Sequence, residues 1–197
     1  MKRLVLLVLV LLPLRALAGA QQYEPLADSV RARLSAMVSD RAPATMNFRF
    51  SGDAQRWLDQ MEKRLANRIP DRKQRLELLR TVHYEATRAR LDPQLVLGVI
   101  EVESGFRKYA VSKAGARGYM QVMPFWVKLI GQPKHNLFHL RTNLAYGGAI
   151  LRFYLDMEEG DYFRALGRYN GSLGQMDYPR SVLAAWKVRW KYHGPTA

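Results

Sequence analysis

Apolar residues recur every three or four positions over most of the chain from residue 51 onward, and this is the spacing of one helical face. The pair Asp92-Pro93 puts a capping side chain before a proline at the first helical position, which favours the start of a helix there. Strand-like alternation is almost absent, apart from a short turn of sheet expected near residues 111–121. The pattern predicts a mainly α fold, with a helix from the cap at 51–53 to before Pro70 and helices over 71–90, 93–106, 143–157, 162–169 and 180–192.

The segment before residue 51 is less regular. Val30, Leu34 and Met37 have helical spacing, but residues 41–44 break the pattern. We therefore expect residues 21 to about 50 to be loosely attached, with one short helix. Together with the helix before Pro70 they make an N-terminal extension of residues 21–70 with one or two helices, followed by the main domain of residues 71–193.

The first twenty residues have the layout of a secretory signal peptide. Lys2 and Arg3 form a basic start, residues 4–12 are all leucine or valine, and residues 16–20 offer small-residue cleavage sites. A transmembrane anchor would need about 20 apolar residues, which this run does not reach. We expect an exported protein, periplasmic or associated with the cell envelope, and peripheral to the membrane at most.

Composition narrows the classes of function. A length of 197 residues suits one hydrophobic core, and the absence of cysteine excludes disulfide scaffolds, thiolate metal sites and cysteine nucleophiles. The formal net charge of +14 predicts attraction to a polyanion. Export makes nucleic acid a poorer candidate for that partner than a polymer of the cell envelope.

Glu103 is a carboxylate on an apolar helical face. It follows Val99 by four positions and Ile100 by three, whereas Glu101 points to another side of the same helix. Burial among aliphatic side chains raises a carboxyl pKa, which suits a general acid working near neutral pH. The alternative is a structural glutamate paired with a buried arginine, whose pKa would fall instead. The local pattern alone leaves both open.

Three motifs recur in a known order. Residues 103–106 read Glu-Ser-Gly-Phe, residues 115–124 read Gly-Ala-Arg-Gly-Tyr-Met-Gln-Val-Met-Pro, and residues 168–171 read Arg-Tyr-Asn-Gly. Over residues 71–192 the chain resembles the catalytic domain of soluble lytic transglycosylases, which are lysozyme-like enzymes that cleave bacterial peptidoglycan. The resemblance implies a mainly α, lysozyme-like fold with little or no β structure.

The resemblance also implies roles for individual residues. Glu103 would be the sole acid/base. Residues expected to contact the glycan are Ser104, Ser112, Gly118, Met120, Gln121, Met123, Tyr169, Asn170 and Tyr178. The chain departs from the family pattern at Tyr119, where leucine is usual, at Arg168, where alanine is common, and at Phe125-Trp126 after the Met-Pro pair.

Aromatic residues divide into two expected groups. Tyr119, Trp126 and Tyr169 offer flat faces on which sugar rings could stack, while Trp57, Trp186 and Trp190 have helical spacing and are expected to pack in the core.

No aspartate or glutamate occurs from Ser104 to Leu155, and Asp177 is the remaining candidate for a second carboxylate. Ordinary glycosidases use two carboxylates. One carboxylate favours the family's substrate-assisted reaction, in which the acetamido oxygen stabilises C1 and the C6 hydroxyl closes a 1,6-anhydro ring on N-acetylmuramic acid. A hydrolase on the same fold is the alternative, and a non-catalytic protein that binds polyanions is a third hypothesis.

The same stretch carries eight basic residues, which could form a positive groove for anionic peptidoglycan or simply a solvated basic surface: Arg107, Lys108, Lys113, Arg117, Lys128, Lys134, Arg141 and Arg152.

His135 and His139 are four apart with no carboxylate nearby, so we expect neither a metal nor another cofactor. The expected partner is a peptidoglycan glycan strand bound by a monomer. Cell-envelope or secretion-machinery partners stay open, and nucleic acid is not expected.

Overall fold

The computed structural model describes residues 21–39 and 52–192. The expected signal peptide, residues 1–20, and the break at residues 41–44 lie outside these ranges. The helices are α1 (Asp28–Ser39), α2 (Gly52–Leu65), α3 (Arg72–Arg88), α4 (Pro93–Ser104), α5 (Phe125–Ile130), α6 (Leu140–Met157), α7 (Tyr162–Asn170), α8 (Asp177–Ala184) and a π-helical turn, η1 (Ala185–Arg189).

The described residues contain no extended strand. Two isolated antiparallel bridges, Val111 with Arg117 and Arg117 with Val122, pin the loop between α4 and α5. This is the short turn of sheet that the sequence predicted. The mainly α fold class is therefore confirmed. Within the described part of the chain, no helix is both long enough and apolar enough to cross a bilayer.

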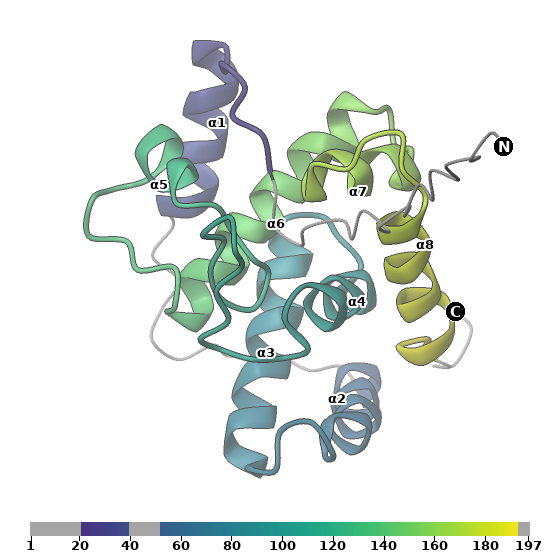
Figure 1. The fold of residues 1–197 in the computed structure, drawn as a ribbon. Helices are drawn as coiled ribbons and strands as arrows, with labels where there is room; N and C mark the ends of the chain where they lie inside the picture. Colours follow the sequence, from purple (N-terminus) through teal and green to yellow (C-terminus); the bar gives the residue numbers. More distant parts are fainter. Residues whose placement is uncertain (1–20, 40–51, 193–197) are drawn as a thin grey trace, which may run out of the picture.

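Helix α4 lies near the middle of the molecule, packed against α3, α8 and η1 (Figure 1). Gly98 permits this packing, because a Cβ there would stand 3.2 Å from the Val182 carbonyl oxygen and from the Trp186 backbone nitrogen. Helices α6 and α7 pack on each other, and α6 also packs on α3. The C-terminal end of α4 is thus held between several helices.

The N-terminal helix α1 packs on α6 and α5, and Leu26, Leu34 and Val38 belong to the hydrophobic core. The prediction of a loosely attached segment is wrong for residues 21–39. Helix α1 has few apolar residues, so its sequence alone does not indicate tight packing. These residues pack on α5 and α6, which are far from α1 in the sequence.

Helix boundaries differ from the predictions in several places. The last helix begins at Asp177 rather than at residue 180 and becomes a π-helical turn over Ala185–Arg189. Helix α5 was not predicted, because six residues give too short a period to detect. Helix α6 begins at Leu140 rather than at residue 143.

Candidate active site

Helix α4 delivers Glu103 to the site in its last turn. Asp92 caps the start of the helix by accepting a hydrogen bond from the Gln94 backbone N–H at 2.7 Å. Gly105 ends it in the left-handed conformation, with φ of 57°, a geometry that glycine adopts at little cost. Glu103 therefore stands where the helix stops and the long loop to α5 begins.

Glu103 is buried without a cationic partner. The residue is 6% exposed, no ion pair within the described residues involves it, and its Oε2 atom is buried with no hydrogen-bond partner. Desolvation raises the pKa of its carboxyl group to about 7, although the hydrogen bond from Tyr178 and the nearby Asn170 amide act to lower it. Of the two sequence interpretations, the geometry fits the desolvated acid and not the glutamate paired with an arginine.

Tyr178, in the first turn of α8, is the direct partner of the carboxyl group. Its hydroxyl donates to Glu103 Oε1 at 2.6 Å. Burial and the neighbouring Glu103 charge hold the Tyr178 pKa well above its usual value, so the phenol keeps its proton and remains a donor. The sequence had tied this residue to the site only through the resemblance.

Tyr169 and Asn170 close α7 just before Gly171, which is left-handed. Both side chains are buried. The Tyr169 hydroxyl donates to the Met120 carbonyl oxygen at 2.7 Å, and burial, together with the nearby Glu103 charge, raises the Tyr169 pKa well above its usual value. The Asn170 Nδ2 atom is buried without a partner. Tyr169 thus fastens the loop to α7, and its ring is not exposed to solvent.

The loop before α5 is shaped by its own polar residues. At Gly118, φ is 76° and a Cβ would lie 2.5 Å from Asn143 Nδ2, so a side chain is excluded there. Gln121 Nε2 donates to the Ala110 and Gly118 carbonyl oxygens, and Ser112 Oγ accepts from the Ala116 N–H. Met120 packs against α6, where Gly147 leaves room for its sulfur. In the structure, these residues, which the sequence analysis expected to contact the glycan, hold the loop in its conformation.

Two residues that organise this loop were missed. Asn143 of α6 accepts from the Met120 N–H at 2.8 Å and donates to the Arg117 and Leu137 carbonyl oxygens. A lone asparagine beside Leu144 and Ala145 was a detectable signal. Gln21 Oε1 accepts from Trp126 Nε1 at 2.9 Å and from the Met123 N–H at 3.3 Å. Nothing in the local pattern around Gln21 indicates this contact.

The remaining expected residues lie in different surroundings. Ser104 is buried and donates to the Ile100 carbonyl oxygen. Trp126 is 2% exposed and packs in the core, so the prediction of a sugar-facing ring is wrong there: the indole is covered by residues from α6 and the N-terminal segment. Tyr119 is also mostly buried.

Among the residues that the structure describes, no second carboxylate joins Glu103. Asp177 is exposed at the start of α8. The other buried carboxylates near α4 are engaged by arginines: Glu101 with Arg68 at 2.6 Å and Glu85 with Arg141 at 2.9 Å. In the described ranges no group of three or more histidine, aspartate or glutamate side chains could hold a metal ion.

The two histidines considered as metal ligands, His135 and His139, have different surroundings. His135 Nδ1 lies 2.8 Å from the Tyr146 hydroxyl, while His139 is exposed and precedes α6.

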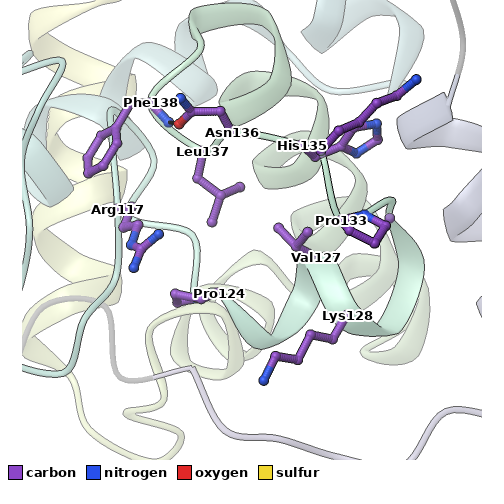
Figure 2. A pocket seen from close by; sticks show the side chains of 11 residues that line it. Arg117, Pro124, Val127, Lys128, Pro133, His135, Asn136, Leu137 and Phe138 are labelled. Atoms are coloured by element: carbon purple, nitrogen blue, oxygen red, sulfur yellow. Dashed lines mark hydrogen bonds between the residues drawn. The ribbon is translucent and has the colours of Figure 1, made fainter.

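The eight basic residues do not act as one group. Arg141 and Arg152 are paired with Glu85 and Asp156, and Arg107 donates to the Ser104 carbonyl oxygen. Arg117, Lys128 and Lys134 line one cavity beside α5 (Figure 2).

The chain was compared with known protein families, and one of them matches the part that holds these residues. The family model described as "Transglycosylase SLT domain" matches residues 80–181, which is more than half of the chain and includes every predicted site residue. The chain belongs to the transglycosylase SLT domain family. The sequence-based resemblance and the lysozyme-like, mainly α fold class of this SLT domain are thereby confirmed.

Individual relatives of this SLT domain share the match over 127 residues. The transglycosylase of Enterobacteria phage PRD1 is 35% identical, covering 61% of this chain and 47% of the phage protein. The membrane-bound lytic murein transglycosylase C of Histophilus somni (strain 2336) is 37% identical, covering 56% and 34%. The chain thus spans between a third and a half of the length of these relatives. A solved structure of an inactive mutant of lytic transglycosylase Slt from Pseudomonas aeruginosa aligns with a TM-score of 0.48 and 22% identity, over 56% of this chain and 23% of that one.

Proposed function

We propose that this protein is a peptidoglycan lytic transglycosylase. It cleaves the β-1,4 bond between N-acetylmuramic acid and N-acetylglucosamine and leaves 1,6-anhydro ends. The observation that carries the proposal is Glu103, a buried carboxyl group whose pKa is raised to about 7 and beside which the described part of the chain places no second carboxylate. Relatives named as lytic murein transglycosylases support the choice of substrate.

The reaction uses Glu103 twice. The protonated carboxyl group donates to the glycosidic oxygen as the C1–O bond breaks, and the acetamido oxygen of the muramic acid stabilises C1. Glu103, now ionised, accepts the proton of the C6 hydroxyl, whose oxygen closes on C1. Atoms balance without water, and the carboxyl group is protonated again for the next cycle.

Two neighbours support both states of the acid. The Tyr178 hydroxyl already donates to Oε1, and this hydrogen bond favours the ionised form that appears midway through the reaction. The Asn170 amide lies close enough to lower the Glu103 pKa, and its Nδ2 atom makes no hydrogen bond in the structure, so it can donate to the second carboxylate oxygen or to the glycan. The carboxyl pKa therefore stays near neutrality despite full burial.

The glycan reaches Glu103 once side chains around it move, because Oε2 is covered. The loop of residues 171–176 joins Asn170 to the helix that carries Tyr178. It holds two left-handed glycines, Gly171 and Gly174, and exposes the apolar side chains of Leu173 and Met176. We assign the opening movement to this loop, whose exposed apolar groups would then contact the bound sugar.

The proposed substrate, peptidoglycan, lies in the cell envelope, so the enzyme has to be located there. We propose export to the periplasm or cell envelope, with the glycan strand as partner, no cofactor and a monomeric state. The proposed contribution of Ser112, Gly118, Met120, Gln121 and Met123 is to keep the loop wall of the groove in shape, through the hydrogen bonds of Ser112, Gln121 and Met123 and the close packing at Gly118 and Met120.

Mass spectrometry of the products from purified peptidoglycan tests the proposal. The expected products end in 1,6-anhydro-N-acetylmuramic acid. Products heavier by one water molecule, with free reducing ends, would instead establish the hydrolase. In that case exposed Asp177, next in sequence to Tyr178, is the carboxylate to mutate first.

A further inference from the structure

A cavity of about 840 Å³ lies between α5, the loop of residues 131–138 and Arg117. Figure 2 shows Arg117 on one side of it and Val127 and Lys128 of α5 on the other. None of the residues predicted to contact the glycan lines this cavity, so it is distinct from the site around Glu103.

The lining is cationic and contains no carboxylate. Arg117, Lys128 and Lys134 line the cavity, and none of the three forms an ion pair with any residue in the described ranges. Arginines elsewhere on the described surface are commonly paired, as Arg75 is with Glu62. The positive charge here is therefore uncompensated, and an anionic ligand would supply the missing partner.

The cavity is also partly apolar, and its backbone packs closely on α6 at Gly131. Pro124, Val127 and Leu137 contribute apolar surface. A Cβ at Gly131 would fall 1.5 Å from the Tyr146 hydroxyl, so only glycine fits at this position of the lining. The same hydroxyl also contacts His135. Apolar surface beside cations fits a short peptide with carboxylates better than a bare polyphosphate.

The cavity and the acid share one loop. Met120 accepts the hydrogen bond from Tyr169 next to Glu103, while Arg117 and Pro124, at the two ends of the same segment, line the cavity. In peptidoglycan the stem peptide is attached to the muramic acid whose bond is cleaved. We infer that the cavity binds the free carboxylates of this stem peptide, an inference that rests on the proposed function.

The test compares two substrates with matched charge variants. The double variant Lys128→Glu/Lys134→Glu reverses two of the cations. On glycan strands with stem peptides its KM should rise roughly tenfold, as expected for the loss of several partly exposed charge pairs, with kcat little changed. On strands stripped of peptides by an amidase, the variant should match the wild-type protein. The control Lys63→Glu/Lys191→Glu makes the same charge change at exposed sites away from the cavity and should keep the wild-type preference.

Binding of a synthetic stem tetrapeptide, followed by NMR, tests the cavity without turnover. Resonance shifts at Arg117 and residues 127–137 that vanish in the double variant would support the inference. Cleavage of both substrates with equal KM by the wild-type protein, or an equal loss on both in the variant, would overturn it while leaving the proposed function standing. Peptide binding without cleavage of any peptidoglycan would overturn the proposed function instead.

Discussion

Helix α4 carries two mostly buried glutamates, two residues apart, in opposite electrostatic settings. Glu101 accepts hydrogen bonds from Arg68 at 2.6 Å, Arg189 at 3.0 Å and the Trp190 indole at 2.6 Å. Glu103 Oε1 accepts a hydrogen bond from the neutral Tyr178 hydroxyl, and no arginine of the described residues pairs with it. One face of the helix therefore holds a neutralised anion that ties α4 to the chain terminus, and the other holds an acid that burial keeps protonated near neutral pH.

The difference between the two carboxyl groups comes from their partners, since residue type, helix and degree of burial are similar. Glu85 of α3 repeats the arrangement of Glu101, with Arg88 at 2.7 Å and Arg141 at 2.9 Å. Where a buried carboxylate is structural in this protein, arginines surround it. Within the described residues no arginine pairs with Glu103, and this difference supports our proposal that Glu103 is the acid.

The largest expected effect is on catalysis. Glu103→Gln keeps the size of the side chain and can still accept the Tyr178 hydrogen bond, but it cannot donate a proton to the leaving oxygen. Because the proposed mechanism uses Glu103 as both acid and base, we expect the rate of peptidoglycan cleavage to fall by roughly 10³-fold or more. Turnover of purified peptidoglycan measures this, with Glu101→Gln as the matched control. An active Glu103→Gln protein, or an inactive but folded Glu101→Gln protein, would reverse our reading of the two faces.

The same substitution should change stability in a pH-dependent way. A carboxyl pKa raised from about 4.5 unfolded to about 7 folded stabilises the native state below pH 4.5, and this contribution is lost as pH rises through 7. Removing the ionisable group should therefore stabilise the protein above pH 7, by up to about 3 kcal/mol. Denaturant unfolding of both proteins at pH 4 and pH 8 measures it. If the free energies of unfolding of the variant and the wild-type protein differ by the same amount at pH 4 and at pH 8, the raised Glu103 pKa is refuted.

Glu101→Gln should affect stability and leave chemistry intact. The amide loses the charge that two arginines and an indole N–H approach, and hydrogen bonds to charged groups contribute about 1.5–3 kcal/mol each. Because both arginines are partly exposed, we expect a loss of about 2 kcal/mol in total. Urea unfolding measures this loss, and activity of the folded variant should stay close to that of the wild-type protein. Unchanged stability would mean that the arginine contacts do not hold α4.

Tyr178→Phe gives the smallest expected change and refines the account of Glu103. The hydroxyl stabilises the ionised carboxylate, so its removal should raise the Glu103 pKa further. We expect the alkaline limb of the pH–rate profile to move to higher pH and the rate at neutral pH to fall about tenfold, the loss expected for one hydrogen bond to a charged group. A purely structural tyrosine would lower stability and leave the position of the limb unchanged.

The sequence predicted the parts of the site that depend on local pattern. The Asp92-Pro93 start of α4 and the apolar face that buries Glu103 are properties of twelve consecutive residues, and the structure reproduces both. The loop motif and the end of α7 were assigned to the site through the resemblance to lytic transglycosylases, and Gly118 and Gly171 in them are left-handed in the structure.

Contacts between distant segments could not be predicted. The Tyr178 hydrogen bond joins residues 75 positions apart, and Gln21 reaches Trp126 across 105 positions. A tryptophan next to a conspicuous Met-Pro pair looks like a ligand-binding residue, yet its burial depends on α6 and the N-terminal segment. Pairing of Glu101 and Glu85 with arginines is likewise a product of tertiary packing.

The most direct test of the contrast is a titration of the two carboxyl groups on α4. NMR of protein labelled with ¹³C at the glutamate side chains, assigned with the Glu101→Gln and Glu103→Gln variants, reports the ionisation of each. We predict a pKa of about 7 for Glu103, with Tyr178 and Asn170 limiting its rise. A Glu103 carboxyl group that titrates in the ordinary range near 4 would contradict the account, because it would be ionised at neutral pH and unable to serve as the acid.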